Sequence, residues 1–428
     1  MTALSTMIAT DAPVAVVQRF WNRTRISGAV LVAAGVVAAA VFGSLAAEQQ
    51  ARFTLSETAG GAALRIPGKL GAVLFGLATL AAGALLLSPY GARWFRWLLG
   101  VGIVGFVVSF LCWQISTAPT GQNFMPMVNI VRGTFLLALP LIFGSLAGVL
   151  CERSGVVNVA IEGQLLMGAF AGALIGTMSG NVWVGLIAAA FGGAFISLLL
   201  ALFAIRYLVD QVVIGIVLNL FAIGLTGFLY ERLMQTDQPA YNQPPHFGTW
   251  EIPLLSDIPV LGPALFRGSI FLYLALILVV VINVALFRTR WGLRTRSIGE
   301  HPIAADTLGV RVLGLRYRNV LLAGMVAGIG GGSYTLLLYS FTKNMIGGKG
   351  FIALAAMIFG RWSPTGALLA SLFFGFADQL GAYLGAISSA IPSQFLAMLP
   401  YLATLLAVAG LVGRVRAPAA DGKPYIKA

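Results

Sequence analysis

The sequence is dominated by apolar runs that are long enough to cross a lipid bilayer. A helix needs about 20 mostly apolar residues to span the hydrocarbon core. Such runs lie at 26–47, 69–88, 97–116, 130–151, 156–179, 182–205, 211–230, 269–287, 319–341, 343–361, 363–385 and 391–413. Hydrophobic residues make up 59% of the 428 positions and charged residues only 10%. The sequence therefore predicts an all-α, polytopic membrane protein of about twelve transmembrane helices.

Some of these runs allow a second interpretation. The runs 130–151 and 156–179 nearly touch, and 343–361 opens with glycines and lysines. Irregular backbone at membrane depth is tolerated only where protein or water covers it. The segment 343–361 is therefore predicted to be either a full span or a broken, re-entrant helix. The first run, 26–47, follows a basic segment, as in a signal peptide, but its length favours a retained helix.

The distribution of Lys and Arg, which give the chain a net charge of +13, predicts its orientation in the membrane. Lys and Arg are enriched in cytoplasmic loops. An N-terminal segment 1–25 on the cytoplasmic side places the arginine-rich stretch 288–318 and the basic tail 414–428 on that side too. The proline-rich loop 231–268 then lies outside. We expect a multi-pass protein with both termini cytoplasmic and no role in binding nucleic acid.

No constellation of catalytic or metal-binding residues is visible in the sequence. The two histidines, His246 and His301, fall on opposite sides of the predicted membrane, and Cys112 and Cys151 form no CxxC pair. The phosphate-binding pattern GxxxxGK[ST] does not occur. We therefore expect neither an enzyme nor a cofactor of its own, and ATP-driven transport would need a separate ATPase.

Several polar residues lie inside the apolar runs and are candidates for a transport path. Glu162 and Asp378 are acidic, and an acidic residue at a helix centre costs about 2.5–3.5 kcal/mol on insertion scales. Such residues line a water-filled path or pack between helices, and both alternatives stay open. Asn158, Gln164 and Asn219 either belong to this path or form interhelical hydrogen bonds. Gly168, Gly172 and Gly176 recur every four residues, which predicts a close contact between helices.

The basic stretch 288–318 contains a short amphipathic pattern. Pro302 suits the first residue of a helix and Gly309 suits its end, which predicts a helix at about 302–308. Flanking arginines allow an interfacial helix held by positive charge. The alternative is a helix on which a cytoplasmic partner docks.

Three segments in this order resemble one protein family. They are CERSGVVNVAIEGQLLMGAF at 151–170, GEHPIAADTLGV at 299–310 and GKGFIALAAMIFGRWSP at 348–364. The sequence resembles bacterial ABC importer permeases of the branched-chain amino acid, ribose and nucleoside group. The form of the first motif is most similar to the branch that takes up nucleosides and simple sugars.

The resemblance implies a type II-like ABC importer permease bundle over 125–413, in the plasma (inner) membrane. Residues 26–116 would be an N-terminal extension of about three helices. The implied partners are an ATP-binding cassette ATPase that binds ATP and Mg²⁺, a second homologous permease and an extracytoplasmic substrate-binding lipoprotein. The stretch 288–318 would be the coupling loop, where the ATPase contacts Gly299, Glu300, Ala304, Ala305 and Gly309.

Two other functions are compatible with the same residues. A secondary transporter could move protons through Glu162 and Asp378, and a membrane scaffold would transport nothing. The segment 299–310 discriminates the ABC permease from the secondary transporter, because substitution of Gly299 or Glu300 should uncouple transport from ATP hydrolysis only in the ABC permease. Loss of uptake in Glu162→Gln, at unchanged expression, would count against the scaffold.

Overall fold

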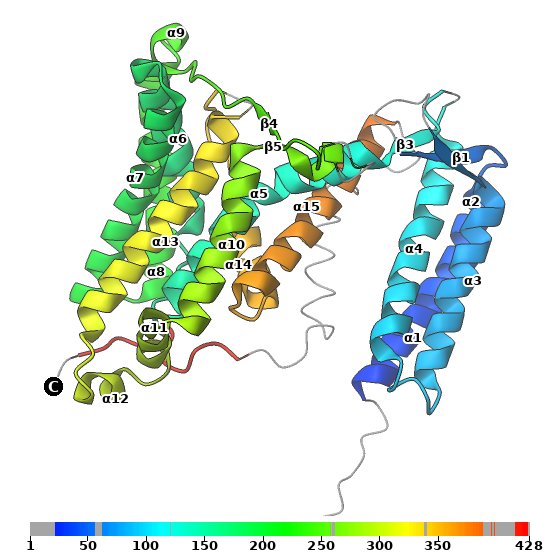
Figure 1. Cartoon of the computed structure of the whole chain (residues 1–428), viewed down its shortest axis with the longest axis horizontal. Helices are drawn as coiled ribbons and strands as arrows, with labels where there is room; N and C mark the ends of the chain where they lie inside the picture. The colour runs from blue at the N-terminus through cyan, green and yellow to red at the C-terminus, as the bar shows by residue number, and fades with distance from the viewer. Residues whose placement is uncertain are drawn as a thin grey trace, which may run out of the picture. The chain divides into compact units, whose positions relative to one another are not determined.

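A computed structural model describes residues 22–55, 62–119, 121–256, 258, 262–337, 340–387, 395, 398 and 416–426. Figure 1 shows their helices and strands. The α-helices are α1 (Arg23–Val37), α2 (Gly43–Leu45), α3 (Gly68–Leu87), α4 (Phe95–Thr117), α5 (Met127–Glu152), α6 (Ile161–Ser179), α7 (Val182–Ala201), α8 (Gln211–Leu229), α9 (Gln238–Tyr241), α10 (Ile270–Arg288), α11 (Arg290–Glu300), α12 (Pro302–Thr307), α13 (Val312–Thr335), α14 (Lys349–Phe359) and α15 (Pro364–Ala386). Four π-helical turns are η1 (Ala38–Phe42), η2 (Leu202–Arg206), η3 (Tyr230–Met234) and η4 (Gly262–Phe266). The strands are β1 (Gln50–Thr54), β2 (Ala63–Pro67), β3 (Phe124–Pro126), β4 (Thr249–Glu251) and β5 (Arg267–Ser269).

Ten helical segments among the described residues are long and apolar enough to cross a membrane. Three of them run on through π-helical turns, at Arg23–Leu45, Val182–Arg206 and Gln211–Met234. The other seven are α3, α4, α5, α6, α10, α13 and α15. This confirms the expectation of a helical, polytopic membrane protein.

The predicted count of twelve is not confirmed. Of the two alternatives for 343–361, the full span is not observed, because α14 has only 11 residues and extends about 16 Å, roughly half of a bilayer core. The run 319–341 is shifted, since α13 already begins at Val312. Because Arg316 and Arg318 are charged, the sequence predicted that the span begins after them, although both lie within α13. The run 391–413 lies outside the described residues apart from Phe395 and Met398, so it stays a prediction.

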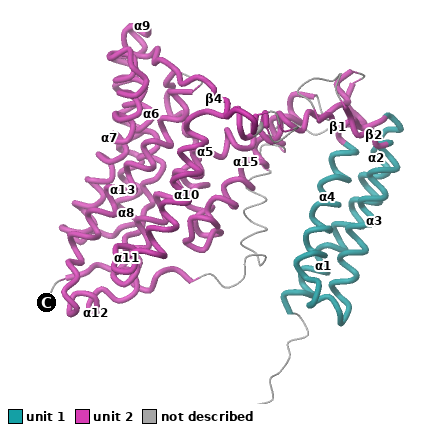
Figure 2. Tube along the Cα trace, in the orientation of Figure 1, with its two compact units in different colours: residues 1–49, 67–113 teal, residues 50–66, 114–428 magenta. Residues whose placement is uncertain are grey.

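The chain divides into two compact units, coloured separately in Figure 2. Unit 1 comprises 1–49 and 67–113. Its helices α1 and α3 touch through small residues: a Cβ on Gly35 would lie 2.4 Å from the backbone nitrogen of Leu80. Phe42 stacks on Trp113 with ring centroids 5.0 Å apart. Unit 1 is therefore held together by close apolar contact.

Unit 2 comprises 50–66 and 114–428 and is built around α5. Helices α13, α14, α15 and α10 pack against α5, so every residue from Ala138 to Glu152 is buried. Helices α6, α7 and α13 form a second tight group (Figure 1). A Cβ on Gly168 would lie 2.3 Å from the Gly328 carbonyl oxygen. The predicted close helix contact at Gly168 is thereby confirmed.

Short strands add detail to the all-α expectation. Strand β1 pairs in parallel with β3, in a sheet of order β2-β1-β3 with Arg52 opposite Phe124. Strands β4 and β5 form an antiparallel hairpin with Trp250 opposite Gly268. The hairpin comes directly before α10 and lies beside the beginning of α5.

Candidate functional site

The most polar part of the interior surrounds an interruption between α5 and α6. Residues 153–160 form turns and extended backbone. Asn158 and Gln164 exchange two side-chain hydrogen bonds of 3.0 Å, and Gln164 also donates to Ser197 of α7 at 2.8 Å. Asn219 of α8 accepts the Gly163 N–H at 2.8 Å and donates to the Val159 carbonyl at 2.9 Å. These amides therefore hold the start of α6 and the loop before it.

Glu162, in the first turn of α6, holds the beginning of α14. Its two carboxylate oxygens accept the N–H groups of Gly348 at 2.8 Å and of Gly350 at 2.6 Å. The first N–H groups of a helix have no partner within the helix, and a negative charge favours the positive end of its dipole. Gly350 must lack a side chain, because a Cβ there would lie 2.4 Å from the Glu162 nitrogen. Helices α6 and α14 thus meet at their N-termini.

Asp378 lies on α15 and forms an ion pair with Lys349, the first residue of α14. Both side chains are largely buried, with 16% and 23% of their surface exposed. Lys349 also interacts electrostatically with Glu162. The two acidic residues predicted from the sequence are therefore linked through the first turn of one short helix.

The structure brings all five predicted path residues to this region. Asn158, Glu162, Gln164 and Asn219 form one connected set at the start of α6, and Asp378 joins it through Lys349. The first four are at most 4% exposed. In this conformation they bond to other parts of the protein. Their contact with a transported solute stays a prediction.

The three sequence motifs meet at the end of the bundle where α5 ends. Glu152 accepts a 2.6 Å hydrogen bond from the Trp362 indole, and Arg153 donates to the Trp362 carbonyl at 2.9 Å. A Cβ on Gly299 would lie 2.3 Å from the Arg153 carbonyl oxygen. Segments separated by more than a hundred residues are thus in direct contact.

The predicted coupling residues occupy α11, α12 and the turn after them. Pro302 opens α12, and Gly309 has a left-handed φ of 80°, as the predicted helix requires. Ala305 is buried, whereas Ala304 is exposed. Ile303 and Leu308 are 73% and 85% exposed. Together they give α12 an apolar outer surface. The sequence missed α11, an eleven-residue helix within the predicted loop.

Sequence reasoning also missed three residues beneath α12. Arg316 is 2% exposed, although its place in a basic stretch predicts an ordinary loop charge. Asp421 and Tyr425 belong to the tail, for which the sequence predicts only a basic character. Burial raises the pKa of Asp421 to about 7. Burial also lowers the pKa of Arg153. The one sequence signal for a packed tail was the presence of an Asp and a Tyr among the basic residues of 416–426.

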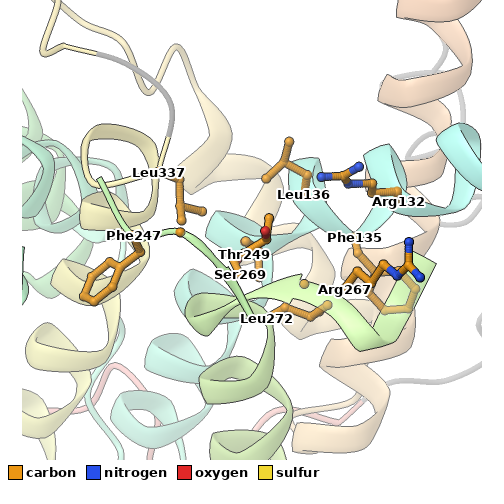
Figure 3. A pocket seen from close by; sticks show the side chains of 12 residues that line it. Arg132, Phe135, Leu136, Phe247, Thr249, Arg267, Ser269, Leu272 and Leu337 are labelled. Atoms are coloured by element: carbon orange, nitrogen blue, oxygen red, sulfur yellow. The ribbon is translucent and has the colours of Figure 1, made fainter. Parts of the chain in front are cut away.

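A cavity of about 130 Å³ lies between the beginning of α5, the β4–β5 hairpin and the beginning of α10. Figure 3 shows Arg132 and Arg267 on one side and Phe247 on the other. Phe135, Thr249, Ser269 and several leucines complete the lining. The cavity therefore combines aromatic rings, guanidinium groups and hydroxyls. Among the described residues no group of three or more His, Cys, Asp and Glu could hold a metal ion.

A bundle of membrane-spanning helices with buried polar breaks defines a polytopic protein of the transporter type. The sequence model of a protein family, described as the branched-chain amino acid transport system permease component, matches residues 130–411. This chain belongs to that family of ABC transporter permeases.

Two similar proteins are nucleoside permeases. The guanosine ABC transporter permease NupQ of Bacillus subtilis is 43% identical over 309 residues, covering 70% of this chain and 96% of NupQ. The nucleoside ABC transporter permease NupC of Lactococcus lactis is 41% identical, again covering 70% and 96%. A putative glucose ABC transporter permease of Haloferax volcanii, TsgC13, is 32% identical over 59% of this chain and 76% of its own length. No solved structure matches.

Proposed function

We propose that this chain is the permease subunit of an ATP-binding cassette importer for nucleosides, with simple sugars as the second class of solute. The observation that carries the proposal is the 43% identity to a guanosine permease across 96% of that protein. The chain itself does not hydrolyse ATP. A partner ATPase binds ATP and Mg²⁺, a second related permease completes the path, and an extracytoplasmic lipoprotein delivers the solute. Both termini and α12 face the cytoplasm.

In this mechanism the ATPase docks on the apolar outer surface of α12. Movement of α11 and α12 reaches the α5 end through Gly299, which packs directly on the Arg153 backbone. The loop 153–160 continues into α6, where Glu162 holds the beginning of α14. A shift of the loop therefore changes the contact between two helices that both begin inside the membrane. Discontinuous helices at mid-membrane are common at transport sites.

The solute enters beside α5 and α10. The cavity there offers Phe135 and Phe247 for packing on a planar base, and Thr249 and Ser269 for hydroxyl groups. A guanidinium such as that of Arg132 matches the paired acceptors on the edge of a guanine base. Phe135→Ala is expected to raise the KM for guanosine more than it lowers the maximal rate.

Uptake of radiolabelled guanosine and glucose into vesicles containing the assembled importer tests the function. ATP-dependent accumulation of guanosine, abolished by inactivating the partner ATPase, is the expected result. Accumulation that persists without any ATPase and follows a proton gradient would favour the proton-coupled alternative. The binding of Glu162 and Asp378 by fixed N–H groups and Lys349 argues against that alternative, because both carboxylates already have partners.

A further inference from the structure

The C-terminal segment 416–426 lies directly against the ATPase-docking region. The N–H of Ala420 donates to the Gly299 carbonyl at 2.9 Å, and the N–H of Ala419 donates to a Glu300 carboxylate oxygen at 3.1 Å. The tail therefore bonds to the last two residues of α11, just before α12 begins.

Arg316 joins the same tail to the loop 153–160. Its Nη1 donates to the Lys423 carbonyl at 3.2 Å, and its Nε donates to the Ser154 carbonyl at 3.1 Å. The approach is close: a Cβ on Gly155 would lie 2.7 Å from Arg316 Nη2 and 3.2 Å from the Ala420 carbonyl oxygen. Gly155 has a left-handed φ of 83°, which also favours glycine.

Asp421 connects the tail to the third motif. A hydrogen bond joins its carboxyl group to that of Glu152, which also accepts the Trp362 indole N–H. A hydrogen bond between two carboxyl groups requires a proton on one of them. The positive charge of Arg316 lies close to Asp421 as well. One side chain of the tail therefore contacts both α5 and α13.

Tyr425 gives the tail its apolar anchor. It is 7% exposed and packs in one cluster with Ile298 of α11, Ala305 of α12 and Val312 of α13. Its hydroxyl also bonds to Asp306 of α12. Helix α12 has six residues and only Ala305 is buried. A helix this short has little stability of its own, so its position depends on what packs beneath it.

We propose that the segment 416–426 is a positioning element of the coupling apparatus, which ties the ATPase-docking helix α12 to the loop 153–160 through Asp421, Tyr425 and Arg316. Apart from the tail, α12 packs against its neighbours in the chain, α11 and α13, and Ala305 is its one buried residue. When the tail is docked, a displacement of α12 is transmitted to the Ser154 backbone, to α6 and to the contact of Glu162 with α14. This inference rests on the proposed function.

Tyr425→Ala in the full chain, assembled with its ATPase and binding protein, is the principal test. We expect solute moved per ATP hydrolysed to fall by about tenfold, while the ATPase still copurifies. Ile426→Ala is the matched control, because Ile426 is 72% exposed. An unchanged ratio for Tyr425→Ala would overturn the inference. Absence of ATP-driven uptake by the wild-type complex would instead overturn the proposed function.

Hydrogen exchange provides a readout that does not need transport. In Tyr425→Ala, the amides of α12 and of 153–157 are expected to exchange faster than in the wild type, while α7 keeps its protection. Equal exchange in α12 would contradict the proposed anchoring even if the variant transported poorly. A chain ending at residue 415 should show the same pattern more strongly, and unchanged protection there would also overturn the inference.

Discussion

The two units bury polar groups in different ways. In unit 1 the hydroxyl of Thr79 donates hydrogen bonds to the carbonyl oxygens of Phe75 and Gly102. The hydroxyl of Ser109 donates to the carbonyl oxygen of Ala72. These are neutral groups within a bundle of apolar helices. Unit 2 instead buries carboxylates, amides and Arg316, which bond across long separations, as between Glu162 and Gly350.

This difference separates contacts that only hold helices together from contacts that can couple the movement of one helix to another. Burial of a charge is costly unless it is paired and hydrogen-bonded. Unit 2 buries charged groups at two places. One is the contact of α6 with α14, and the other is the group of Arg316, Asp421 and Glu152 near α12. The family model, which matches 130–411, covers both places except for the tail. We therefore expect transport to depend on the polar contacts of unit 2 and little on the packing of unit 1.

Glu162→Ala should produce the largest effect. It leaves the N–H groups of Gly348 and Gly350 without their acceptor, at about 1–3 kcal/mol each. We expect uptake of labelled guanosine to be lost at equal abundance in the membrane. Glu231→Ala is the matched control, because Glu231 pairs with Lys343 at an exposed position. Normal uptake by Glu162→Ala would show that the α14 contact is dispensable.

Gly299→Ala should have the next largest effect. The added Cβ would lie 2.3 Å from the Arg153 carbonyl oxygen, so α11 must move away from the α5 end. We expect solute transport per ATP to fall by about tenfold, with ATP hydrolysis retained. Gly314→Ala on α13, where a Cβ would meet nothing within 4 Å, is the control. Parallel loss of hydrolysis and transport would indicate failed assembly instead.

A smaller effect is expected from pH, through Asp421. Its pKa in the folded chain, about 7, is above the ordinary value of 3.8. Docking of the tail is therefore most favourable below pH 4 and weakens as the pH rises through 7. The facing groups are Glu152, Cys151 and Arg316. The protection of the amides of 416–426, after correction for the intrinsic pH dependence of hydrogen exchange, should be lower at pH 8 than at pH 6, and Asp421→Asn should remove this difference. Equal protection of the wild type at both pH values would contradict it.

Hydropathy predicted most of the fold because spans depend on composition. The spans at 182–205 and 363–385 differ from the observed segments by a residue or two. At 343–361 it left a full span and a broken helix as alternatives, because an apolar run of span length does not reveal where the backbone breaks. Glycines at 347–350 indicated the irregularity, but only the structure shows that Glu162 holds the helix start there.

The sequence predicted which residues belong to the candidate site, but not the residues to which they bond. The rarity of acidic residues in apolar runs singles out Glu162 and Asp378 from the sequence alone. Their bonds to Gly350 and Lys349 depend on helices far apart in the sequence. Arg316 and Asp421 were missed for a related reason, since a charge near a helix end is usually solvated. They are buried because the tail, α13 and the end of α5 with the loop after it pack together.

Gly35→Leu should have the smallest effect on transport, and it tests the comparison between the units most directly. The new side chain would meet Leu80 of α3, because even a Cβ would lie 2.4 Å from the Leu80 nitrogen. Packing of α1 on α3 should weaken, and proteolysis of the loop before β1 should accelerate. Uptake should stay within about twofold of the wild type. Gly100→Leu is the matched control, because a Cβ at this position would meet nothing within 4 Å. If Gly35→Leu abolished uptake as Glu162→Ala does, at equal abundance in the membrane, unit 1 would belong to the transport machinery and would not be a purely structural extension.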